Sequence, residues 1–106
     1  MLNPAQQTKV REYYDRLIAK TTELVSQSDY GRALALAWQA ESVERLLDVK
    51  PIAGAIKDDL QAKIDELSRT DRERHSKTCA IISDAVIGDW TNHMREWGIL
   101  PQQIYS

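Results

Sequence analysis

Three side chains that could bind a metal ion follow one another at steps of four residues: Asp71, His75 and Cys79. In a helix, this spacing places them on one slowly rotating face. A carboxylate, an imidazole and a thiolate are all accepted by transition metals. A structural zinc site normally takes four ligands, however, and the sequence offers no second cluster to supply the rest. We therefore interpret Asp71 and His75 as solvated residues and Cys79 as a small buried apolar residue, and we expect no metal and no cofactor.

The common catalytic and nucleotide-binding motifs do not occur in this sequence. It has no glycine-rich phosphate loop, no Cys-x-x-Cys pair, no nucleophile elbow and no His-Glu-x-x-His. Neither His75 nor His93 follows a glutamate at the spacing used by iron-binding helix bundles. An enzyme would need charged residues from separate helices to converge in the core, which spacing alone leaves open. We expect a protein that is not an enzyme.

The densest basic group lies within residues 69–77, which contain three arginines and one lysine. Such a group could neutralise the phosphates of a nucleic acid. Asp71 and Glu73 interrupt it, and no aromatic residue stands among the basic ones to stack on a base. A solvated helix face with local ion pairs is the favoured interpretation. A small nucleic-acid-binding regulator that uses residues 69–77 is the alternative function.

Apolar and aromatic residues are concentrated near the end of the sequence. Trp90, Met94 and Trp97 share one helix face, and further apolar residues follow them. Tryptophan, tyrosine and methionine are enriched at protein interfaces, but they also fill ordinary cores, so core packing is the alternative. We predict a partner-binding surface, shared with another protein or with a second copy of the chain, made of Trp90, Met94, Trp97, Leu100, Ile104 and Tyr105.

Helices are the elements expected to carry these residues. Asn3 can cap a helix that opens at Pro4, and Gln6 can reach back to the cap. Apolar residues then recur every three or four positions along most of the chain, which is the period of a helix with one buried face. Pro51 interrupts this pattern, because proline lacks the amide donor that a helix needs. These patterns predict helices over about 4–26, 29–49, 53–69 and 71–97, followed by an irregular tail over 98–106.

Two segments allow a second interpretation. Residues 68–77 contain no apolar side chain, so either the third helix continues past its neighbours, or a capping box at 70–73 opens a separate fourth helix. Residues 78–88 contain enough β-branched side chains for a strand. We favour a helix there, because the spacing of three and four continues through Trp90 and Trp97 without a turn signal.

Composition limits the class of protein. The chain has 106 residues, which suits one domain, and 42% apolar with 28% charged residues is typical of an ordered globular protein. A formal net charge of −2 gives no bulk attraction to nucleic acid or to an acidic membrane. One cysteine cannot form an internal disulfide, no apolar run approaches a membrane span, and the start lacks the pattern of a secretory signal. We expect a cytoplasmic protein without a membrane partner.

The order of segments resembles that of a known protein family. A first amphipathic helix, the break "SQSDYG", the run "ESVERLL" and the long polar-studded "LQAKIDELSRTDRERH" together look like the small flagellar export chaperones of the FliT class, over roughly residues 13–80. The block "DWTNHMREWGILPQQIYS" departs from that class, whose last helix controls access of the substrate. The resemblance implies a cytosolic helical protein that binds an apolar segment of another protein and has no active site.

Taken together, these patterns predict an all-α antiparallel bundle of three to four helices with short loops and an irregular C-terminal tail. The expected function is non-enzymatic protein binding, as a small adaptor, an export-chaperone-like protein or an inhibitor.

Overall fold

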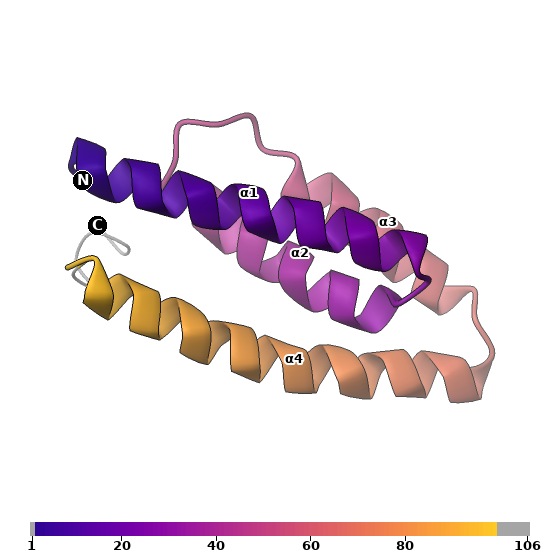
Figure 1. The fold of residues 1–106 in the computed structure, drawn as a ribbon. Helices are drawn as coiled ribbons and strands as arrows, with labels where there is room; N and C mark the ends of the chain where they lie inside the picture. Colours follow the sequence, from indigo (N-terminus) through magenta and orange to yellow (C-terminus); the bar gives the residue numbers. More distant parts are fainter. Residues whose placement is uncertain (1, 100–106) are drawn as a thin grey trace.

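The computed structural model describes residues 2–99, and all regular structure within that range is helical (Figure 1). Four helices follow one another along the chain: α1 (Pro4–Ser26), α2 (Tyr30–Glu44), α3 (Ala53–Asp65) and α4 (Arg69–Glu96). Residues 78–88, for which a strand was the alternative, lie inside α4. The predicted all-α bundle is confirmed.

The predicted start of α1 is present in detail. Asn3 Oδ1 accepts a hydrogen bond from Gln6 N–H at 2.8 Å, and Gln6 Oε1 accepts one from Asn3 N–H at 3.1 Å. Pro4 occupies the first helical position, where a missing amide donor costs nothing. Two backbone donors that a helix leaves unpaired at its start are thereby satisfied.

The helix predicted over 29–49 is wrong at its C-terminal end, because α2 ends at Glu44. The Glu44 carboxylate accepts hydrogen bonds from the backbone N–H groups of Ile52 and Ala53, each at 3.0 Å. It also accepts one from Tyr14 Oη at 2.5 Å. A glutamate at the end of α2 therefore caps the start of α3, and the chain must turn back within residues 45–52 to bring those amides to it.

The boundary between α3 and α4 also differs from the prediction. α3 ends at Asp65 rather than at 69, and α4 begins at Arg69 rather than at 71. Ser68 Oγ accepts a hydrogen bond from Asp71 N–H at 3.3 Å and lies 3.1 Å from Asp71 Oδ2, to which it donates. Of the two alternatives for this segment, the separate fourth helix is confirmed, with Ser68 and not Thr70 as its cap.

α2 is the central helix of the bundle and packs against each of the other three (Figure 1). Consecutive helices run in opposite directions, so α2 and α4, which are separated by α3, run parallel to each other. Small side chains on α2 allow its neighbours to approach, because interaxial distances depend on the side chains at the contact. The buried alanines of α2 are Ala33, Ala35, Ala37 and Ala40.

Candidate partner-binding surface

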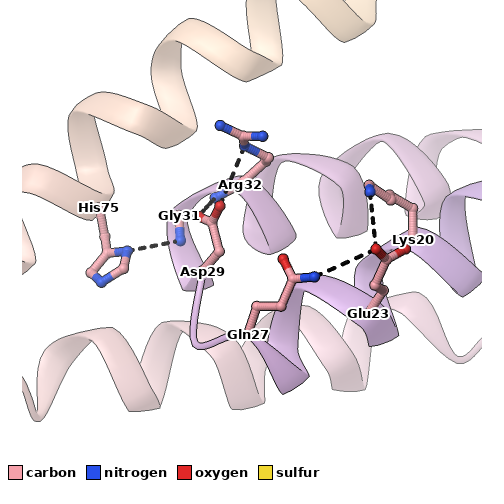
Figure 2. Close-up of polar contacts among 7 residues, drawn as sticks. All are labelled: Lys20, Glu23, Gln27, Asp29, Gly31, Arg32 and His75. Atoms are coloured by element: carbon pink, nitrogen blue, oxygen red, sulfur yellow. Dashed lines mark hydrogen bonds and ion pairs between the residues drawn. The ribbon is translucent and has the colours of Figure 1, made fainter.

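Near its start, α4 is fixed to the bundle by a contact between His75 and Gly31. Nδ1 of His75 accepts a hydrogen bond from Gly31 N–H at 3.1 Å (Figure 2). Gly31 belongs to the first turn of α2, where a backbone amide has no partner within its own helix. Because Nδ1 is the acceptor, the proton of the neutral imidazole is on Nε2. The interpretation of His75 as solvated is wrong: it is buried, because the start of α2 packs on it.

The contact at Gly31 requires a glycine. A Cβ atom at this position would lie 2.3 Å from the carbonyl oxygen of His75 and 2.9 Å from its Cα. Both atoms belong to the backbone of α4 and cannot rotate away as a side chain would. The backbones of α2 and α4 are therefore in direct contact at this point.

Near its other end, α4 is fixed by aromatic packing against α1. The rings of Trp90 and Tyr13 stack with their centroids 5.0 Å apart, and Trp97 meets both rings edge-on at 6.3 Å. The His93 ring stacks on Trp97 at 4.8 Å. Burial of Tyr13, with a smaller contribution from the charge of Asp89, raises the pKa of its hydroxyl to about 12. This cluster joins α1 to α4 through large side chains.

The predicted partner-binding residues fall into three groups. Trp90 is buried in the aromatic cluster. Met94 and Trp97 pack against the core but remain partly accessible. The other predicted members, Leu100, Ile104 and Tyr105, lie outside the described residues. Of the three predicted residues that the structure describes, one belongs to the core and two lie partly at the surface.

The end of α4 is also tied to α1. Gln6 Nε2 donates to the carbonyl oxygens of Trp97 and Gly98, each at 3.1 Å. Gly98 has a φ of 69°, in the left-handed region that glycine adopts readily, and Ile99 N–H donates to Met94 O at 2.8 Å. Ile99 is buried as a result. The first residue beyond this turn therefore belongs to the core.

Between these two attachments, the middle of α4 is apolar without being buried. Residues 78–88 contain a single charged side chain, that of Asp84, and none of the eleven residues is buried. Ile81 is 68% exposed and Ile87 is 55% exposed. A helix that is apolar on most of its sides is usually enclosed by protein. Here α4 contacts the bundle on one side only, so much of its apolar surface faces solvent.

A groove runs between α2 and the middle of α4. It has a volume of about 340 Å³ and is lined by Ala35, Trp38, Gln39 and Ser42 of α2 and by Cys79, Ser83, Val86 and Ile87 of α4. We call this surface the α2–α4 groove. Trp38 stands at its edge with half of its surface exposed. Lys57 Nζ lies over the Trp38 ring, 4.1 Å from its centroid, and pairs with Glu41 at 3.1 Å.

One residue that lines the groove carries a buried polar atom without a hydrogen-bond partner. Nε2 of Gln39 is buried and makes no hydrogen bond to the described part of the chain, and the same holds for Tyr13 Oη. The two side chains are near each other, since the Gln39 amide lowers the Tyr13 pKa slightly against the larger effect of burial. Gln39 Nε2 has almost no accessible surface, so it belongs to the packing beside Tyr13 rather than to the open part of the groove.

Trp38 and Ile87 were not predicted as site residues. Trp38 belongs to an alanine- and leucine-rich helix whose two apolar rows suggest burial against two neighbours. Ile87 belongs to a run that is apolar on all sides, which resembles a core segment. Apolar residues on every side of 78–88 were the available signal, because a helix at the edge of a bundle cannot bury them all.

Two arginines of the basic segment pair with acidic residues of the same helix. Arg69 pairs with Glu73 at 3.2 Å, and Arg74 pairs with Asp71 at 3.3 Å, all on the exposed start of α4. Cys79 is partly buried in the groove.

Within residues 2–99, no group of three or more His, Cys, Asp and Glu side chains is placed to hold a metal ion. None of the described helices is long and apolar enough to cross a membrane.

Comparison of the chain with protein-family models, with curated proteins and with solved structures finds no match. What this surface can bind is therefore inferred from its own chemistry.

Proposed function

We propose that this chain is a non-enzymatic protein-binding module, acting as a small adaptor, chaperone or inhibitor, and that its partner binds in the α2–α4 groove. The observation that carries the proposal is the pair of large apolar side chains, Trp38 and Ile87, that border the groove while half or more of each is exposed. Exposed apolar residues that gather in one place mark interaction sites more often than scattered ones do.

The composition of the groove supports a protein partner. Its floor is apolar, and its few polar groups are uncharged: the Gln39 amide and the hydroxyls of Ser42 and Ser83. The Lys57 and Glu41 pair beside Trp38 is charged and partly exposed. An apolar centre with a polar rim is the usual arrangement of a protein interface. An apolar segment of a partner protein would suit this groove.

The predicted residues at the end of α4 remain part of the proposal. Met94 and Trp97 are partly accessible and extend the apolar surface along the same helix.

We also propose a cytoplasmic location, which the single cysteine supports, since structural disulfides characterise oxidising compartments.

The test is a comparison of captured proteins. The immobilised chain and a Trp38→Gln/Ile87→Gln variant are exposed to the same cell extract, and retained proteins are quantified by mass spectrometry. A matched control, Ala19→Gln/Ala62→Gln, places the same polar groups at exposed helix positions elsewhere. We expect at least one protein to be retained by the native chain and by the control but lost from the groove variant, by tenfold or more. Identical sets of proteins on all three would contradict the proposal.

A further inference from the structure

A second surface of α4 lies outside the groove, on the side of the helix that faces away from the bundle. Lys77, Ile81, Asp84 and Gly88 follow one another at helical spacing and form one stripe. All four are exposed. Ile81, at 68%, is more exposed than the other exposed large apolar side chains within residues 2–99, which are Trp38, Ile52 and Ile87. We call this set the outer stripe. α4 runs along one side of the bundle, so this face is open to a partner (Figure 1).

We propose that the outer stripe binds a second copy of this chain, with the two α4 helices packed antiparallel. This interface goes beyond the proposed function, because it uses a different face of α4 and leaves the α2–α4 groove open. A symmetric pair is the simplest assembly that covers the stripe, since each copy then buries the same patch against its partner.

The charge distribution along α4 favours this partner. Residues 69–77 carry four basic and two acidic side chains, whereas residues 84–96 carry three acidic side chains and one arginine. The helix is therefore basic in its first part and acidic in its second, with an almost uncharged middle. Two antiparallel copies place each basic part beside an acidic part, whereas two parallel copies would place like charges together.

The outer stripe itself contains the charges that could set the register. Arg69, Arg74 and Glu73 have ion-pair partners within their own helix, but Lys77 and Asp84 form no ion pair with any other described residue. They flank Ile81, with Lys77 four residues before it and Asp84 three residues after it. In an antiparallel pair centred beside Ile81, Lys77 of each copy meets Asp84 of the other. The two Ile81 side chains then pack near the symmetry axis.

Small side chains border this contact. Ala80 and Ala85 are exposed beside Ile81, and a Cβ atom at Gly88 would meet no other atom within 4 Å. Glycine in the middle of a helix is less favourable than alanine, and no contact within residues 2–99 requires it at this position. Small residues allow two helices to approach closely, which a pair of α4 helices would use.

The experiment measures self-association of the full chain by sedimentation over a wide range of concentration. The native chain should form a dimer in a concentration-dependent manner. Lys77→Asp and Asp84→Lys should each weaken the dimer about tenfold or more, because either change opposes like charges twice in a symmetric pair. Mixing the two variants should restore association, because each charge then meets its opposite on the other chain.

Two controls accompany this experiment. The double variant Lys77→Asp/Asp84→Lys should dimerise like the native chain, since residues 77 and 84 are two turns apart and the exchange restores both contacts between copies. Ile81→Gln should weaken the dimer, whereas Ala62→Gln on α3 should not. Circular dichroism must show that every variant remains helical.

A native chain that stays monomeric at every concentration would overturn the inference. A dimer whose dissociation constant is unchanged by Lys77→Asp, Asp84→Lys and Ile81→Gln would also overturn it. Neither result affects the proposed function, which the Trp38 and Ile87 variants test on the other face. A groove variant that loses its partners while remaining dimeric would separate the two surfaces directly.

Discussion

Gly31 of α2 and His75 of α4 bring two helices that are not consecutive in the chain into backbone contact. The amide of Gly31 donates to the imidazole Nδ1 at 3.1 Å, so a side chain of α4 satisfies an open donor at the start of α2. The hydrogen bond and the absence of a Cβ atom act together. They fix the close approach of α4 to α2 one helical turn before the groove residues Ala35 and Cys79.

Gly31→Ala should therefore destabilise the fold. The new methyl group would lie 2.3 Å from a backbone oxygen, and relief requires α4 to move away from α2. We expect a loss of roughly 2–4 kcal/mol in the free energy of unfolding, measured with urea, because overpacking and a broken buried hydrogen bond both contribute. Gly88→Ala in α4 is the control and should be neutral or stabilising, by up to about 1 kcal/mol, in the monomer. Equal effects at the two glycines would show that helix propensity alone matters.

Loss of the His75 acceptor should also be measurable. His75→Leu removes Nδ1 while keeping an apolar side chain in a buried position. The Gly31 amide would then be buried without a partner, at a cost of about 1–3 kcal/mol. Hydrogen exchange of the Gly31 amide, followed by NMR, should become faster in this variant. An unchanged exchange rate would mean that the hydrogen bond does not protect the start of α2.

Glu44 should make the stability of the protein depend on pH. Burial would raise its pKa, but hydrogen bonds from Tyr14 and from two backbone amides stabilise the carboxylate more, so the pKa is lowered in the folded state. A lowered pKa means that the carboxylate stabilises the fold above its ordinary pKa of 4.5, and that this contribution is lost as the pH falls through the folded-state value.

Glu44→Gln should lower the free energy of unfolding at pH 7 by about 2–3 kcal/mol, because hydrogen bonds to a charged group are lost. The variant and the native chain should approach each other in stability as the pH falls below 4.5 and through the lowered folded-state pKa. Tyr14→Phe should cost about 1–2 kcal/mol, since burial and the Glu44 bond keep the phenol neutral, with a raised pKa, as a donor. Glu12→Gln, at an exposed position of α1, is the control. Parallel pH curves for the native and Glu44→Gln proteins would contradict this prediction.

The tryptophans of α4 and α2 should differ in their contribution to stability. Trp90 is buried against Tyr13, so Trp90→Ala should cost about 3–5 kcal/mol or unfold the chain. Trp38 is half exposed, and Trp38→Ala should cost about 1 kcal/mol or less, including its contact with Lys57. Thermal unfolding followed by circular dichroism compares the two. A larger loss at Trp38 than at Trp90 would reverse the assignment of core and surface.

Nucleic-acid binding through residues 69–77 should be weak. Two of the four basic side chains already pair with Asp71 and Glu73, which leaves little net charge for phosphates. A dissociation constant of about 10⁻⁶ M or weaker is expected for duplex DNA at physiological salt, as for non-specific binding. Fluorescence anisotropy with a labelled duplex measures it. Tight binding would favour the alternative function if Arg72→Ala also lowered, by about one unit, the slope of the logarithm of the binding constant against the logarithm of the salt concentration.

The sequence alone determined the features that depend on residues within one helical turn. The capping box at Asn3 and Gln6 and the helical period of residues 78–88 are both set locally, by side chains that reach neighbouring amides or repeat along one face. Long amphipathic helices therefore follow from the residue order, and so does the all-α class.

Only the tertiary structure decided where α2 ends, whether His75 is buried and which apolar residues of α4 face solvent. α2 ends at Glu44, whose carboxylate meets amides eight and nine residues later, after the chain has turned back. Trp90 and Ile81 are both apolar residues of one helix, yet one is buried and the other exposed. Burial depends on which helix lies opposite, and hydrophobic attraction has no direction that a sequence period could specify. The groove and the outer stripe exist because α2 occupies the centre of the bundle and covers α4 on one side.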